Sequence, residues 1–107
     1  MDFILEERVE KARDLFRQGY NCSQSVFLAY NDLLGVESTL AATISGPLGG
    51  GMGRLREVCG AVSGMFMAAG LIFGSDDVSH EKKTAQYLRL QTLAAQFREK
   101  NGSLLCR

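Results

Sequence analysis

An uncharged apolar segment constrains the fold of this chain more than any other feature. It runs from Val58 to Gly74, VCGAVSGMFMAAGLIFG, and its 17 residues carry no charged side chain. A membrane-spanning helix normally needs about 20 apolar residues, and charged residues lie on both sides of this segment. A helix that is apolar on every face is usually buried on every face. We therefore expect a buried, glycine-rich central helix from about Leu55 to Phe73, and no membrane span.

The rest of the sequence predicts more helices and no sheet. Apolar residues recur at helical spacing throughout, and no run alternates with period two. Asn21 and Gln24 form a capping-box pair, and Gly19, Gly35 and Gly46 are typical helix stop signals. A chain of 107 residues is long enough for one core. We expect an all-α helical bundle forming a single domain over residues 1–107, with four main helices and one short helix, at 5–16, 22–34, 38–44, 55–73 and 78–100.

Charge and composition exclude some functions. Twelve basic and twelve acidic residues balance, so no net field would attract nucleic acid. The charges of EERVEKARDLFR are interpreted as a solvated helix face. The acidic N-terminus does not have the pattern of a signal peptide, which favours a cytoplasmic protein with reduced thiols. Because 46% of the residues are hydrophobic, we also expect a homodimer that covers surplus apolar surface.

Three cysteines are the candidate reactive residues. Cys22 follows the cap residue Asn21, so it lies in the first turn of a helix, where unpaired N–H groups favour a thiolate. Cys59 lies in such a turn if its helix starts near residue 57, but past it if the helix starts at Arg54. Arg54 and Arg56 are candidates for holding its thiolate. Cys106 is the third cysteine, one residue from the end of the sequence. There is no C-x-x-C motif, so the residues alone leave reactive and inert cysteines equally open.

A glycine-rich stretch precedes the central helix. Residues 46–64 contain seven glycines. They do not form a phosphate-binding P-loop, because Met52 and Gly53 stand where that motif needs lysine and a hydroxyl. The backbone N–H groups of such a run can still hold an anion or a thiolate. This predicts a stabilising role, with a tight loop packed on the core as the alternative, for Gly49, Gly50, Gly51, Gly53 and Arg54.

The stretches GYNCSQSVF at 19–27, GGGMG at 49–53 and CGAVSG at 59–64 resemble the C_GCAxxG_C_C family of redox-active proteins. Cys59 to Gly64 fit the family's Cys-Gly-Ala-x-x-Gly box at each fixed position. Cys22 corresponds to the upstream cysteine and Cys106 to the third. The resemblance covers essentially the whole chain and implies a thiol-based redox or metal role. The sequence ends at Arg107, about where a fourth cysteine would be expected, so a shortened chain and a member without it both remain open.

Three functional hypotheses follow. The leading one is a thiol-disulfide oxidoreductase without a required cofactor, in which Cys22 reacts with a redox partner, Cys59 resolves the disulfide and Cys106 relays it to the surface. The second is an iron–sulfur cluster or another thiolate-bound metal held by Cys22, Cys59 and Cys106. The third is a small helical interaction module with structural cysteines. We expect Cys22 and Cys59 to approach each other at one end of the bundle, beside the loop Gly49–Gly53.

Overall fold

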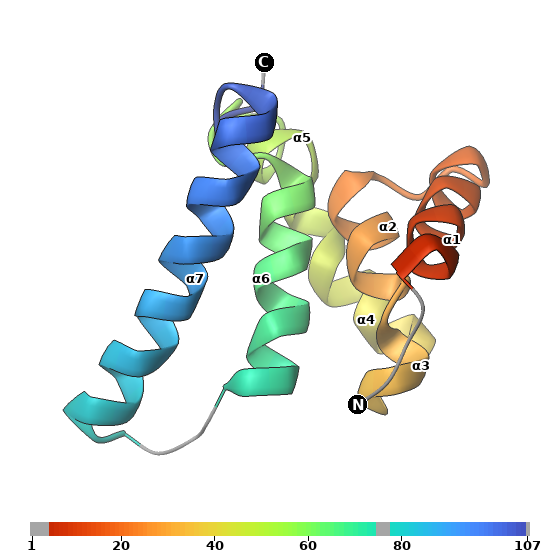
Figure 1. Ribbon diagram of the computed structural model, residues 1–107. Coiled ribbons are helices and arrows are strands. Elements are labelled where there is room, and N and C mark those ends of the chain that lie inside the picture. Colours follow the sequence, from red (N-terminus) through yellow and green to blue (C-terminus); the bar gives the residue numbers. More distant parts are fainter. Residues whose placement is uncertain (1–4, 75–77, 107) are drawn as a thin grey trace.

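The protein is described here by a computed structural model, which covers residues 5–74 and 78–106. Its helical elements follow one another along the chain (Figure 1). The only pairing of extended backbone within the described residues is a single antiparallel bridge between Val58 and Leu105. The predicted all-α class is therefore confirmed. The elements are α1 (Leu5–Arg17), α2 (Cys22–Leu28), α3 (Asn31–Leu34), α4 (Ser38–Ser45), the 3-10 helix η1 (Gly46–Leu48), α5 (Gly49–Met52), α6 (Gly60–Phe73) and α7 (His80–Asn101).

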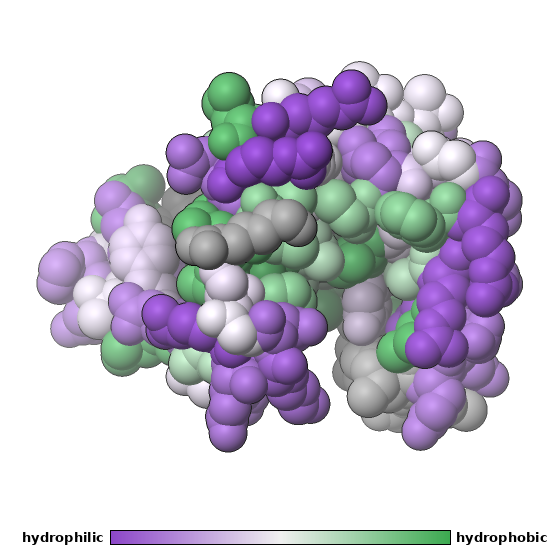
Figure 2. Space-filling model, turned by 90° about the horizontal axis from the view of Figure 1, so that it is seen from above, coloured by the Kyte–Doolittle hydropathy of each residue, from purple (hydrophilic) through white to green (hydrophobic). Residues whose placement is uncertain are grey.

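Helix α6 lies in the middle of the molecule, between α7 on one side and α2 with α4 on the other (Figure 1). The core forms where α2 and α4 meet α6, around Phe27, Leu28, Ala41 and Ala68. Seen from above, hydrophilic side chains cover the edge on the α1 side, while apolar side chains gather in the middle of this face (Figure 2). The central position of α6 therefore agrees with its apolar sequence.

Glycines let α2 and α6 approach closely. A Cβ atom at Gly64 would lie 2.6 Å from the carbonyl oxygen of Ser23 and 3.1 Å from Cβ of Val26. A Cβ atom at Gly60 would collide with Sγ of Cys22. Each glycine inside a helix costs about 1 kcal/mol relative to alanine. At these two positions that cost is offset by backbone-to-backbone contact, which no larger residue would allow.

Buried hydrogen bonds fix the start of α2 against α4. The Ser23 hydroxyl donates to the carbonyl of Ser45 at 2.6 Å, and the Asn21 side chain donates to the carbonyl of Gly46 at 2.9 Å. The predicted capping box is confirmed, because Asn21 accepts from the Gln24 N–H while the Gln24 side chain accepts from the Asn21 N–H. The first turn of α2 is therefore held in one place and one orientation.

Two predicted helices have different bounds in the structure. Helix α6 begins at Gly60 and not near Leu55, because Gly50–Arg54 and Arg56 have left-handed backbone conformations that a right-handed helix cannot include. The predicted helix over 22–34 is split into α2 and α3. The guanidinium of Arg8 donates to the carbonyl of Ala29 at 2.9 Å, and the N–H of Leu33 bonds to Tyr30 instead, so the helical pattern is interrupted there.

Burial of α6 is incomplete, and α7 is more exposed still. Val62, Ala68 and Ala69 on α6 are buried, whereas Leu71 is 50% exposed and lines an apolar groove with Leu40 and Ile44 of α4. No described residue of α7 is fully buried. None of the described helices is long and apolar enough to cross a membrane. The predicted homodimer stays a prediction.

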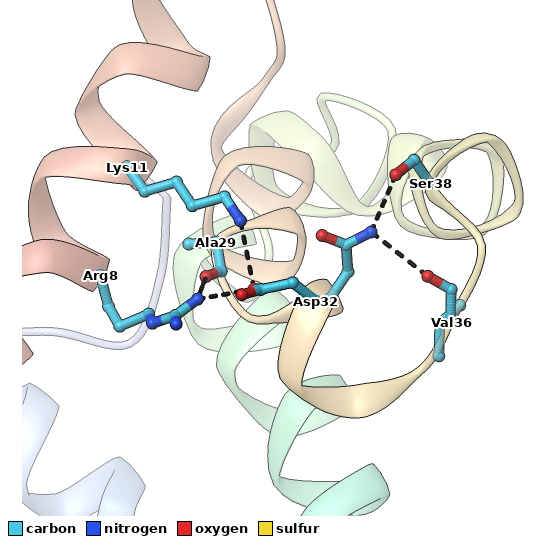
Figure 3. A network of polar contacts seen from close by, with 7 residues as sticks. Arg8, Lys11, Ala29, Asp32, Val36 and Ser38 are labelled. Carbon is cyan, nitrogen blue, oxygen red and sulfur yellow. Dashed lines mark hydrogen bonds and ion pairs between the residues drawn. The ribbon is translucent and has the colours of Figure 1, made fainter. Parts of the chain in front are cut away.

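An ionic network joins α1 to α3 (Figure 3). Arg8 lies 2.6 Å and Lys11 3.2 Å from the same carboxylate oxygen of Asp32. The hydrogen bond from Arg8 is the main cause that lowers the pKa of Asp32 from 3.8 to about 2. This network holds α1 over the junction between α2 and α3.

We predict that Gly64→Ala destabilises the protein by about 1–3 kcal/mol, because the added methyl group meets the backbone of α2. Gly70→Ala is the matched control on the same helix. A Cβ at Gly70 has no neighbour within 4 Å among the described residues, so alanine should stabilise the helix by about 0.5–1 kcal/mol. Urea unfolding of both variants measures the two effects. Equal effects of the two substitutions would contradict the packing described here.

We also predict that Asp32→Asn lowers the free energy of unfolding at pH 7 by less than about 1 kcal/mol, since the Asp32 side chain is 52% exposed and solvent screens its ion pairs. A carboxyl whose pKa is depressed on folding stabilises the protein above its unfolded pKa and stops doing so as the pH falls through its folded pKa. The difference from the wild type should therefore shrink between about pH 4 and pH 2. Asp14→Asn, which removes an exposed pair with Arg17, is the control variant for the loss of a surface ion pair at pH 7. A pH-independent difference for Asp32→Asn would contradict this.

Candidate functional site

The three cysteines surround the segment that leads into α6. Cys22 is the first residue of α2, and its Sγ packs against Gly60, the first residue of α6. Cys59 immediately precedes Gly60 and is the N-cap of α6. All three cysteines are partly buried, and none is in a disulfide. The sulfur of Cys22 therefore packs against the residue that follows Cys59 in the sequence.

Cys106 reaches the same segment from the C-terminal side. The N–H of Cys59 donates to the carbonyl of Leu104, and the N–H of Cys106 donates to the carbonyl of Glu57, both at 2.7 Å. Val58 is paired with Leu105 between these two bonds. Side chains alternate across extended backbone, which places Cys59 and Cys106 on the same side of the pairing as diagonal neighbours. Cys106 is thus a diagonal neighbour of Cys59 in this pairing, while Cys22 contacts the next residue, Gly60.

The glycine-rich stretch forms a left-handed turn beside this segment. Residues 50–54 all have positive φ angles, including the non-glycine residues Met52 and Arg54. The carbonyl of Gly49 accepts hydrogen bonds from the N–H groups of Gly53 and Arg54, and the carbonyl of Gly51 accepts from Glu57 at 3.0 Å. Left-handed backbone costs an L-residue roughly 1–2 kcal/mol, so glycines at three of these five positions make the turn feasible.

Close approach is the second reason for glycine in this turn. A Cβ atom at Gly49 would overlap the side chain of Asn21, which is the N-cap of α2. At Gly51 it would lie 2.7 Å from Cβ of Cys106. The turn therefore contacts the residue before Cys22 and contacts Cys106 directly. The predicted binding of an anion or thiolate by the N–H groups of Gly49, Gly50, Gly51 and Gly53 stays a prediction.

The two arginines after the turn lie differently. The guanidinium of Arg56 donates to Sγ of Cys106 at 3.4 Å, which puts a permanent positive charge beside that sulfur. The side chain of Arg54 lies over Gly50. Sequence reasoning associated both arginines with Cys59. It missed the contact with Cys106 because that contact depends on the pairing of the chain end with residues 57–59, and a single extended pair leaves no periodic pattern in the sequence.

The described residues do not contain a ready-made metal site. No group of three or more His, Cys, Asp and Glu side chains among them is arranged to hold a metal ion. Cys22, Cys59 and Cys106 are near the same segment but do not converge on one point in this arrangement. The predicted metal or iron–sulfur role of these cysteines stays a prediction.

A groove opens beside Cys22. Its volume is about 410 Å³, and it lies between α1, α2 and the start of α6. The charged residues of α1 were predicted to be a solvated helix face, but Arg13 and Arg17 line the groove beside Cys22. The sequence shows Phe16 at the end of an apolar stripe with Arg13 and Arg17 beside it, and the structure shows that Phe16 is 60% exposed. The lining residues are Ala12, Arg13, Phe16, Arg17, Cys22, Ser25, Val26 and Ala61.

We predict that Gly51→Ala destabilises the site by about 1–3 kcal/mol, because the methyl group meets Cys106 and the backbone of residues 56–57. It should also loosen the chain end, so that alkylation of Cys106 becomes faster than in the wild type. Gly53→Ala is the matched control. Its φ of +64° carries a similar conformational cost, but the nearest atom is the carbonyl oxygen of Pro47 at 3.8 Å. Equal alkylation rates of Cys106 in the two variants would be evidence against the contact.

Comparison with known protein families gave a match over most of the chain. A family model described as "Putative redox-active protein (C_GCAxxG_C_C)" matches residues 20–107. The matched range includes the three cysteines, the left-handed turn and the Cys-Gly-Ala-x-x-Gly box. Comparisons with curated proteins and with solved structures found no match. On the strength of the family match, which covers most of the chain, this protein belongs to the C_GCAxxG_C_C family.

Proposed function

We propose that this protein exchanges thiols and disulfides with a redox partner, and that Cys22 and Cys59 are the exchanging pair. The observation that carries the proposal is the packing of Cys22 Sγ against Gly60, the residue that follows Cys59. The description of the family as redox-active supports it. A disulfide requires two cysteine Cα atoms within about 7 Å, and the close approach of α2 and α6 favours this.

The exchange takes place in two steps. The thiolate of Cys22 attacks one sulfur of a disulfide in the partner, so that a mixed disulfide forms and the other partner sulfur leaves as a thiolate. The thiolate of Cys59 then attacks Sγ of Cys22, and the second partner sulfur leaves. Two electrons pass from the cysteine pair to the partner, which gains two thiols after protonation. The Cys22–Cys59 disulfide is the oxidised product.

The surroundings of the pair suit these steps. Cys22 lines the open groove, so a partner sulfur can reach it. Cys59 caps α6 without a side-chain hydrogen bond to the helix, and a helix N-terminus is a favourable place for the negative charge that moves between sulfurs. Cys106, a diagonal neighbour of Cys59 across the Val58–Leu105 pairing, is not a member of the exchanging pair.

The proposal predicts which cysteine substitutions abolish oxidation. In buffers with an increasing ratio of oxidised to reduced dithiothreitol, the wild type and Cys106→Ser should each lose two titratable thiols. Cys22→Ser and Cys59→Ser should lose none over the same range, because each lacks one member of the pair. Thiol counting and intact mass give the result. Loss of two thiols in Cys22→Ser would refute the assignment of the pair. Retention of both thiols in Cys106→Ser would refute it as well.

A further inference from the structure

We propose that the groove beside Cys22 binds small disulfides that carry carboxylate groups, so that Cys22 forms mixed disulfides with anionic low-molecular-weight thiols in preference to neutral or cationic ones. The inference rests on the proposed function in one respect only, which is that Cys22 is the attacking thiol. It adds the chemical class of the substrate and the residues that select it.

The size and apolar lining of the groove suit a small molecule. Its volume of about 410 Å³ lies within the range of ligand sites in proteins. Ala12, Val26 and Ala61 provide apolar walls, and Phe16 presents an aromatic ring that is 60% exposed. The methylene groups next to a disulfide bond can pack on these side chains, which brings the bond towards Cys22.

The charge of the lining selects the substrate. Among the residues that the structure describes, Arg13 and Arg17 are the charged ones that line the groove, and none of the lining residues is acidic. Each pairs with an exposed carboxylate on α1, Arg13 with Glu10 at 3.2 Å and Arg17 with Asp14 at 3.1 Å. Such exposed pairs contribute little, so a ligand carboxylate can compete for both guanidinium groups.

The start of α6 adds to this preference. Ala61, a lining residue, is in the first turn of this 14-residue helix, whose N-cap makes no side-chain hydrogen bond. The N–H of Val62 in this turn bonds to the carbonyl of Cys59, and the helix dipole favours negative charge at this end. Two arginines and an uncapped helix terminus therefore act on a ligand in the same groove.

The covalent step needs no other reactant. The Cys22 thiolate attacks one sulfur of the small disulfide, a bond forms between that sulfur and Sγ of Cys22, and the original disulfide bond breaks. One half of the small molecule stays on Cys22, and the other leaves as a thiolate that takes a proton from solvent. The small disulfide is the oxidant, and Cys22 is oxidised.

The test uses the Cys59→Ser, Cys106→Ser double variant, in which a mixed disulfide on Cys22 cannot be resolved. Its rate of formation is followed by intact mass with glutathione disulfide (anionic), hydroxyethyl disulfide (neutral) and cystamine (cationic). The same three rates are then measured in a variant that also carries Arg13→Gln and Arg17→Gln. Intrinsic differences in reactivity among the three disulfides cancel when the rate ratios of the two variants are compared. We expect these changes to lower the rate ratio of glutathione disulfide to cystamine about tenfold at low salt. High salt should also lower the rate ratio of glutathione disulfide to cystamine in the parent double variant, because salt screens the attraction between charges.

Arg98→Gln, which removes an exposed arginine from α7, is the matched control and should leave the ratio unchanged. An unchanged ratio after substitution of Arg13 and Arg17, in variants that unfold at the same temperature as the parent, would overturn the inference. The result is separate from that of the proposed function, because Cys59 is absent from every variant used. If Cys22 and Cys59 do not pair, the charge preference of Cys22 can still be measured.

Discussion

The close contact between α2 and the glycine face of α6 is the constraint on which the rest of the structure depends. Gly60 and Gly64 leave no side chain between the two helices, so Ser23 and Cys22 lie directly on α6. The hydrogen bonds of Asn21 and Ser23 to the end of α4 fix α2 in that position. The same contact forms the core around Phe27 and puts Cys22 at the start of α6. Packing and chemistry therefore depend on the same two glycines.

The left-handed turn has a complementary role at this end of the molecule. It delays the start of α6 until Gly60, which makes Cys59 the N-cap of the helix and leaves residues 57–59 extended. That extended segment pairs with the chain end and brings Cys106 to Gly51 and Arg56. With right-handed backbone in this turn, the helix would begin earlier. The backbone groups of residues 57–59 would then bond within the helix and would not be free to bond to Cys106.

Much of the fold could be predicted from local patterns. Helical periodicity, the Asn21–Gln24 capping box and the uncharged segment after Val58 all depend on neighbours in sequence, and the structure has the expected elements there. The start of α6 could not be predicted in the same way. Glycine permits a left-handed turn without requiring it, and Met52, Arg54 and Arg56 adopt positive φ angles that their own preferences disfavour. The break before α3 was also missed, because the Arg8 side chain that binds the Ala29 carbonyl is 21 residues away. For the candidate site, the cysteines could be found by residue type, but the groove and the Arg56–Cys106 contact depend on tertiary structure.

The most direct test of the central claim is an NMR measurement of the cysteine Cβ chemical shifts during stepwise oxidation. These shifts distinguish a thiol from a disulfide for each sulfur separately. The account predicts that Cys22 and Cys59 convert together to the disulfide form, while Cys106 stays reduced until the pair has formed. A disulfide between Cys106 and either Cys22 or Cys59 that forms before the Cys22–Cys59 disulfide would contradict it, and so would three cysteines that stay reduced throughout.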